Sequence, residues 1–397
     1  MKLKKIMASF LAAATAITCL TACKTDGNSG SGDNSGDNST ASGATLRIGG
    51  SGPLTGDYAL YGNGVKNGAQ LAVDEINAAG GINGVTLELR VEDDEAAEEK
   101  AVNAYNVLKD WDMDLSIGTV TSGACIAFGA EAAKDNMFLL TPSSTAVECI
   151  AADNAFRVCF SDPNQGVASA DYIADQSLAT KIAAIYQSDN AYSAGIFDKF
   201  KSEASAKNLE IVSEQSFTSD NATDFSAQIQ SIKDSGAELL FLPIYYSEAS
   251  LILQQAKNAG LDIKVFGCDG LDGILNMKNF DVSLAEGVML LTPFAADATD
   301  EATVHFVTEY RAKYGDETMN QFAADAYDAI YIIKAAAEKA NINADMSASE
   351  ICDALKTAMT EITVDGVTGT SITWAADGEP SKAPKAVVIT DGSYKAM

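Results

Sequence analysis

Short apolar runs alternate with longer helical patterns along the chain from Thr45 onward. Runs rich in β-branched and apolar residues predict strands, and we expect them at 45–49, 86–92, 115–117, 137–141, 182–186, 211–217, 239–242, 265–267 and 288–291. Between them, residues 65–79 carry an apolar stripe at helical spacing, made by Ala69, Ala72, Val73 and Ile76. Residues 251–259 show a similar pattern that ends at Gly260. Strands that alternate with helices predict parallel sheets covered by helices, the α/β class.

The length of the chain after residue 43 exceeds that of a single small core, so we expect two lobes. The first lobe is predicted to end near Asp162. Two late helical stretches, 301–314 and 321–339, and the last strands fit either lobe by pattern alone. We find no fixed-period repeat and no second linker, so the chain is expected to cross between the lobes more than once.

The first residues predict export and anchoring. Three lysines at positions 2, 4 and 5 precede an uncharged apolar run, 6–20, which is too short to span a bilayer. The following Leu-Thr-Ala-Cys resembles a bacterial lipobox, which implies that 1–22 is a lipoprotein signal peptide and that Cys23 carries lipid. Residues 23–43 are mostly Gly, Ser, Asp, Asn and Thr, which predicts a flexible linker. The alternative is an ordinary signal peptide with a chance cysteine.

Charge and cysteine content narrow the function classes. A formal net charge of −28 argues against a nucleic-acid partner. Beyond the signal segment stand five cysteines without a C-x-x-C pair, and we expect small buried thiols with Cys149 and Cys159 as the one candidate disulfide. The single histidine, His305, is predicted to be partly buried on a helix, and without a second histidine it forms neither a Ser-His-Asp triad nor a His-based zinc site.

Polar loops follow several of the predicted strands. Ligands of open parallel sheets bind at the carboxyl ends of strands. Ser122 precedes a predicted helix, where hydroxyl and backbone N–H groups hold anions such as carboxylates; the alternative is a simple N-cap. Ser143, Ser144 and Thr145 repeat this chemistry after the next strand. Asp269 follows a second-lobe strand among glycines and is either a ligand-binding carboxylate or part of an Asx turn.

These residues lie in a chain that resembles a known family. The stretch RIGGSGPLTGDYALYGNGVKNGAQLAVDEINAAGGINGVTLEL is similar to the opening of the leucine/isoleucine/valine-binding family of extracellular solute-binding proteins. TSG, LTPSSTA, QSDNAYS, LPIYYSEASLILQQAKNAGL and FAADAYDAIYIIKAA continue the similarity through nearly all of the chain after the linker. The resemblance implies the periplasmic binding protein type I (Venus-flytrap) fold, with two Rossmann-like lobes joined by hinge crossovers. We assign 44–162 and 293–376 to lobe 1, and 163–292 and 377–397 to lobe 2.

The resemblance also implies a ligand site. The family's carboxylate site corresponds to Ser122 and Thr145, and its ammonium site to the carbonyl of Ser143, the carboxylate of Asp269 and the hydroxyl of Tyr245. Tyr192 closes over the ligand, and Tyr61 and Phe322 flank the pocket. We also assign Ser144, in the hydroxyl-rich loop, to the ligand site. Two departures leave open the position of the ammonium group and whether the ligand is an amino acid or another small polar molecule such as an amide: Asp269 is shorter than the family's glutamate, and Ser193 stands where a glycine commonly follows the tyrosine. The ligand's side chain also stays open.

The family's function implies a lipid-anchored monomer on the extracellular face of a bacterial cell membrane. It would capture a small amino acid, branched-chain or similar, and deliver it to an ABC permease, without cofactor, metal or catalysis. Three alternatives remain: a ligand sensor of the same fold, a binder of amides, urea or another small polar solute, and a hydrolase with Ser122 or Ser143 as nucleophile. The hydrolase lacks an evident base.

Overall fold

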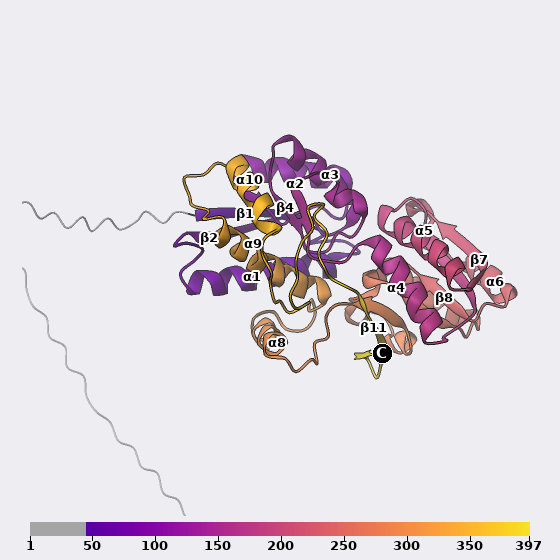
Figure 1. Ribbon diagram of the computed structural model, residues 1–397. Coiled ribbons are helices and arrows are strands. Elements are labelled where there is room, and N and C mark those ends of the chain that lie inside the picture. The colour runs from indigo at the N-terminus through magenta and orange to yellow at the C-terminus, as the bar shows by residue number, and fades with distance from the viewer. Residues whose placement is uncertain (1–44) are drawn as a thin grey trace, which may run out of the picture. The chain divides into compact units, whose positions relative to one another are not determined.

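The computed structural model describes residues 45–397, which fold around two sheets (Figure 1). The predicted signal peptide 1–22, the linker 23–43 and the lipidation site Cys23 lie outside the described residues.

The first sheet is wholly parallel, with strand order β2-β1-β3-β4-β5. Its strands are β1 (Thr45–Gly52), β2 (Thr86–Asp93), β3 (Leu115–Ser116), β4 (Leu139–Thr141) and β5 (Ala155–Arg157). Strand order reverses between β1 and β3, and ligands of such sheets bind outside the carboxyl ends of the strands near that point.

The second sheet has the order β12-β11-β10-β9-β8-β6-β7. Its parallel part repeats the order of the first sheet and contains β6 (Lys181–Gln187), β7 (Glu210–Phe217), β8 (Leu239–Leu242), β9 (Lys264–Gly267) and β10 (Met289–Thr292). Two antiparallel strands extend it at the β10 edge, namely β11 (Lys385–Thr390) and β12 (Ser393–Ala396).

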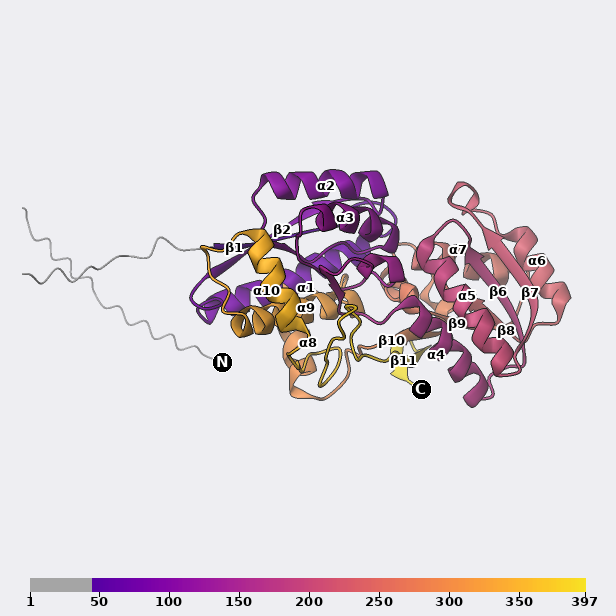
Figure 2. The same ribbon diagram turned by 45° about the horizontal axis from the view of Figure 1, so that its top comes forward.

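Each sheet and its helices form one lobe, as both views show (Figures 1 and 2). The first lobe contains α1 (Ala59–Ala78), α2 (Glu98–Asp110), α3 (Ser122–Lys134), α8 (Glu301–Tyr314), α9 (Gln321–Lys339) and α10 (Ala348–Met359). The second contains α4 (Asp162–Asp175), α5 (Ala191–Ala206), α6 (Ser226–Ser235) and α7 (Tyr246–Asn258). The chain therefore crosses between the sheets after β5, after β10 and after α10. The residue bounds of the lobes given above stay a prediction.

Several polar contacts join the lobes, and two of them end on carboxylates. Tyr58, just before α1, donates a 2.6 Å hydrogen bond to Glu248 Oε1 on α7. The backbone N–H of Gln321, at the start of α9, donates to Asp272 Oδ2 at 2.8 Å. Because both acceptors are buried carboxylates, separating the lobes exposes charged groups to water.

The alternation of strands and helices agrees with the sequence prediction. The predicted bounds of β8, α8 and α9 match those observed, and the apolar stripe of α1 is buried. Helix α7 ends before Gly260, whose φ of +66° suits glycine far better than other residues. Strand β5 was missed: its three residues are Ala-Phe-Arg, and the buried Arg157 interrupts the apolar run.

Two predictions about single side chains were wrong. Cys149 and Cys159 are both free thiols: Cys149 Sγ approaches the carbonyl of Ser122, and Cys159 Sγ that of Ser144. The prediction failed because a separation of ten residues in sequence carries no information on the direction of the two thiols, which contact different carbonyls. His305 is more exposed than predicted, since 53% of its side chain is accessible to solvent and its Nε2 lies 3.1 Å from Glu75 Oε1. The buried face of α8 is formed instead by Thr303, Phe306, Val307 and Tyr310.

Candidate functional site

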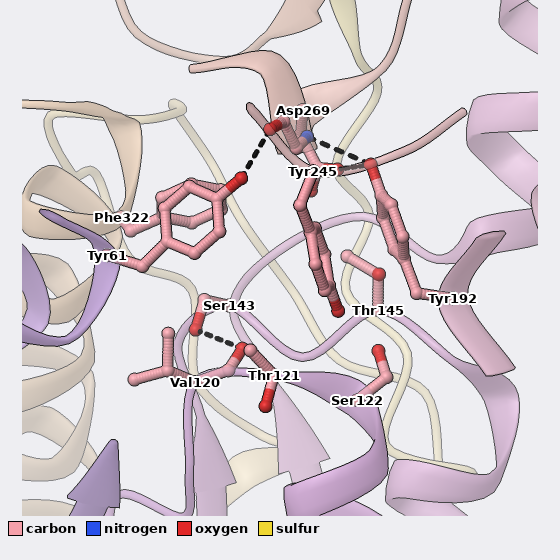
Figure 3. A pocket seen from close by; sticks show the side chains of 11 residues that line it. Tyr61, Val120, Thr121, Ser122, Ser143, Thr145, Tyr192, Tyr245, Asp269 and Phe322 are labelled. Carbon is pink, nitrogen blue, oxygen red and sulfur yellow. Dashed lines mark hydrogen bonds between the residues drawn. The ribbon is translucent and has the colours of Figure 1, made fainter. Parts of the chain in front are cut away.

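A small cavity lies between the two lobes, at the carboxyl ends of both sheets. Its free volume is about 10 Å³. It is lined by Tyr61, Val120, Thr121, Ser122, Ser143, Thr145, Tyr192, Tyr245, Asp269, Gly270 and Phe322 (Figure 3). A cavity of this volume has room for about one water molecule, so the walls must part before an amino acid can enter.

The first-lobe wall is built from the loops after β3 and β4. Ser122 is the first residue of α3, and its Oγ accepts a hydrogen bond from the backbone N–H of Ala146 at 3.3 Å. Ser143 Oγ donates to the carbonyl of Val120 at 3.0 Å. These bonds hold the two loops together, so that the Ser122 and Thr145 hydroxyls lie beside the start of a helix, where backbone N–H groups are unsatisfied.

Arg157 fixes the loop after β4 from behind. Its guanidinium is fully buried, and Nη1 donates to the carbonyls of Ser144 and Thr145. Nη2 donates to the carbonyl of Ala146 at 3.0 Å. Arg157 was not predicted as a site residue, although an arginine inside the otherwise apolar run AFRVCF indicates a buried polar role.

The second-lobe wall carries an acid and two phenols. Tyr192 donates a 2.7 Å hydrogen bond to Asp269 Oδ1 (Figure 3). Burial raises the pKa of Asp269 to about 7, and the hydrogen bond from Tyr192 opposes that shift. The ring of Tyr245 stacks on that of Tyr192 with centroids 4.8 Å apart. Figure 3 shows the Tyr245 hydroxyl directed toward the first-lobe wall.

Aromatic side chains cover the remaining side. Tyr61 on α1 and Phe322 on α9 meet edge to face, with ring centroids 4.8 Å apart. The Tyr61 hydroxyl donates to the carbonyl of Gly270, across the gap between the lobes. The cavity thus has a hydroxyl-rich end, an acidic end and an apolar side.

The structure brings nearly all predicted site residues to this cavity. Ser144 is the exception, because its hydroxyl turns away and donates to the carbonyl of Thr119 at 3.1 Å. Ser193 is likewise absent from the lining, since its Oγ accepts from the backbone N–H of Gln187 at 2.8 Å. Val120, Thr121 and Gly270 line the cavity without having been predicted.

Residues 45–397 contain neither a metal-binding cluster nor a membrane-spanning helix. No group of three or more His, Cys, Asp or Glu side chains there is placed to hold a metal ion. None of the helices described in this range has the length and apolar character needed to cross a membrane.

Known proteins match this chain over most of its length. The family model described as "Periplasmic binding protein" matches residues 45–393. The Leu/Ile/Val-binding protein homolog 3 of Brucella melitensis is 31% identical over 313 residues, which cover 78% of this chain and 83% of that protein. The leucine-, isoleucine-, valine-, threonine- and alanine-binding protein of Pseudomonas aeruginosa is 28% identical over 298 residues, covering 75% and 79% of the two chains.

A solved structure agrees with these matches. The branched-chain amino acid transporter substrate-binding protein LivJ of Streptococcus pneumoniae, crystallised with isoleucine, is 30% identical and superposes with a TM-score of 0.79. The superposition covers 89% of this chain and 98% of LivJ. The chain therefore belongs to the periplasmic binding protein family, among the leucine/isoleucine/valine-binding proteins.

Proposed function

We propose that this protein captures a small amino acid between its lobes and delivers it to the permease of an ABC importer. The observation that supports this most directly is that one cavity has hydroxyl hydrogen-bond donors on one wall and a carboxylate on the other. Ser122 and Thr145 stand on the first-lobe wall, and Asp269 stands on the second. A zwitterion removed from water needs a complementary, hydrogen-bonded partner at each charged end.

The first-lobe wall suits the ligand's carboxylate. Hydroxyls of Ser122 and Thr145 donate hydrogen bonds, and the start of α3 adds backbone N–H groups and the positive end of the helix dipole. No charged side chain is among the described residues that line this wall. The carboxylate would thus be held by neutral donors.

The second-lobe wall suits the ligand's ammonium group. Asp269 is the one carboxylate in the lining of the cavity and is 2% exposed. Its hydrogen bond with Tyr192 leaves Oδ2 for a ligand. The carbonyl of Ser143 and the hydroxyl of Tyr245 would complete the set of acceptors.

Binding would select a closed arrangement of the lobes. A ligand that bridges both walls favours the form in which they face each other, by its difference in affinity for the two forms. Relatives with "Leu/Ile/Val-binding" and "branched-chain amino acid transporter" in their names support both the ligand class and the importer partner. We extend the proposal to a monomer on the extracellular face of the membrane, anchored through Cys23.

We assign no reaction to the site. The single histidine of the chain, His305, lies exposed on α8 and is absent from the cavity lining. Ser122 and Ser143 therefore have no imidazole base, which a hydrolase with a serine nucleophile would need.

Thermal-shift screening of the purified protein against the twenty amino acids, simple amides and urea tests the proposal. A ligand at 100 times its Kd stabilises the native state by about 2.7 kcal/mol. We expect a rise in Tm with one or a few apolar amino acids, and loss of that rise in Asp269→Asn. Asp94→Asn is the matched control, because Asp94 is equally buried but does not line the cavity. No shift with any amino acid, or product formation from an amide or ester, would contradict the proposal.

A further inference from the structure

Arg157 is a buried cation directly behind the wall that we assign to the ligand's carboxylate. It is the last residue of β5, and its side chain has no exposed surface. Its guanidinium donates to three consecutive backbone carbonyls, those of Ser144, Thr145 and Ala146. The N–H of Ala146 in turn donates to Ser122 Oγ at 3.3 Å, and both Ser122 and Thr145 line the cavity. A single layer of backbone therefore separates the guanidinium from the hydroxyls of this wall.

The hydrogen bonds of Arg157 also orient the loop. In a trans peptide the carbonyl and the N–H point in opposite directions. The peptide whose Thr145 carbonyl meets the guanidinium carries the N–H of Ala146, which points to Ser122 in the cavity wall. The peptide whose Ser144 carbonyl meets the guanidinium carries the N–H of Thr145, which donates to no group among the described residues. The guanidinium thus holds both peptides with their donor ends turned away from it.

The positive charge of Arg157 is only partly offset. Its Nη2 lies 3.5 Å from Glu379 Oε1, and the Glu379 side chain is 31% exposed. Water screens an exposed charge more strongly than a buried one. Within residues 45–397, neither Arg157 Nε nor Glu379 Oε2 has a hydrogen-bond partner, so the two side chains do not form the bidentate pair that offsets a guanidinium best. Positive potential therefore remains at the loop.

The charge of Arg157 acts on groups at both ends of this loop. Cys149 Sγ lies 3.6 Å from the carbonyl of Ser122, at the start of α3. Burial raises the pKa of the Cys149 thiol, and the charge of Arg157 opposes that rise. The same holds for the pKa of Cys159, whose Sγ lies 3.4 Å from the carbonyl of Ser144. Arg157 thus favours negative charge in the region where the ligand's carboxylate would lie.

We propose that Arg157 is a positioning residue for the ligand's carboxylate, which holds the donor loop in place and supplies the positive charge that the neutral wall lacks. The inference rests on the proposed function and deepens it. Hydroxyl and N–H groups offer hydrogen bonds to a carboxylate and to a neutral carbonyl alike. A buried cation behind them favours the carboxylate alone, because only the carboxylate carries a full negative charge. The cleft would therefore prefer amino acids over their amides.

The test compares two ligands that differ only at the carboxyl group. Calorimetric titration would use L-leucine and L-leucinamide, or the amino acid among the twenty that raises Tm most together with its amide. Arg157→Met removes the charge and the hydrogen bonds and keeps an unbranched side chain. Arg157→Lys keeps the charge but not the planar fork of donors. Lys356→Met is the matched control, because Lys356 pairs with Asp153 in the same lobe and does not line the cavity.

We expect Arg157→Met to lower the affinity for leucine by about tenfold or more and the affinity for leucinamide much less. The preference for the carboxylate would then be lost. Arg157→Lys should keep most of that preference, and Lys356→Met all of it. Equal losses for both ligands in Arg157→Met would show that Arg157 only supports the fold. An unchanged preference in that variant would show that its charge does not act on the ligand.

Glu379→Gln decides the question if the Arg157 variants do not fold. The change removes the negative charge beside Nη2 and leaves the guanidinium in place. It should raise the affinity for leucine relative to leucinamide, and an unchanged or lower ratio would overturn the role of Arg157. All of these outcomes leave the proposed function standing. Wild-type binding of neutral amides but of no amino acid would overturn both.

Discussion

The Tyr192 hydroxyl donates a hydrogen bond to Asp269 Oδ1 at 2.7 Å and accepts one from the backbone N–H of Gly270 at 2.9 Å. The phenol therefore ties the acidic side chain to the turn that follows β9. It also stabilises the ionised form of Asp269, against a burial that raises the pKa of this carboxyl to about 7.

This balance predicts that ligand capture depends on pH. Below about pH 7, Asp269 in the ligand-free protein becomes protonated and no longer offsets an ammonium group. We expect affinity for the amino acid to fall by up to about tenfold per pH unit below 7. Tyr192→Phe removes the stabilising hydrogen bond and should move the midpoint to higher pH. Calorimetric titration between pH 5 and pH 8.5 measures the midpoint.

Two neighbouring carboxyl groups disfavour the ionised form of Asp269, as burial does. Asp162 on α4 and Asp325 on α9 carry charges that interact unfavourably with an ionised Asp269. A carboxyl with a raised pKa binds more protons in the native than in the unfolded state, so the ligand-free protein should gain stability as pH falls from 8 to 5. Affinity and ligand-free Tm would then change in opposite directions. A parallel change in both, or an unchanged midpoint in Tyr192→Phe, contradicts this prediction.

The buried ion pair between Lys382 and Asp325 predicts a large stability effect. The two side chains are 2% and 1% exposed, and Lys382 Nζ also lies 2.6 Å from Thr368 Oγ1. Lys382→Met leaves Asp325 charged and unpaired, at a cost of about 3–5 kcal/mol. In urea unfolding, the lost stability should appear as a lower midpoint concentration, while the slope of the unfolding free energy against urea concentration stays unchanged.

Two further variants distinguish the cost of leaving Asp325 unpaired from the cost of losing a lysine in general. Lys382→Met combined with Asp325→Leu removes both charges and should recover much of the stability. Lys334→Met breaks the exposed pair with Glu338 on the surface of α9 and should cost less than about 1 kcal/mol. Equal costs for Lys382→Met and Lys334→Met would show that burial of the pair does not matter.

Gly68 allows α1 and α9 to approach closely. A Cβ at position 68 would overlap the carbonyl of Ala323, although the residue lies in the interior of a helix where alanine is normally preferred. Gly68→Ala should therefore destabilise the protein by about 1–3 kcal/mol. Chemical unfolding of the ligand-free protein measures the change.

Gly129, in the interior of α3, is the matched control. The nearest atom to a Cβ at this position would be the Cys149 carbonyl oxygen at 3.8 Å, so an added methyl group has room. Gly129→Ala should be neutral or stabilise the protein by about 0.5–1 kcal/mol through helix propensity. If both substitutions have the same effect, close approach at Gly68 is not the reason for its glycine.

Local pattern was enough to predict the α/β class, the alternation of elements and several of their bounds. The bounds of α8 and α9 follow from side chains three and four residues apart, which any helix brings to one face. The loops that carry Ser122, Thr145 and Asp269 were found because polar residues follow apolar strands, and parallel strands end at one edge of a sheet.

Only the tertiary structure decided which side chains meet across distant segments. It turned Ser144 away from the cavity, kept Cys149 and Cys159 apart, and exposed His305. It also placed Arg157 behind the Thr145 loop and left Asp162 buried without a partner. The sequence does not reveal these outcomes because each depends on a direction in space and on packing between elements that no local periodicity encodes.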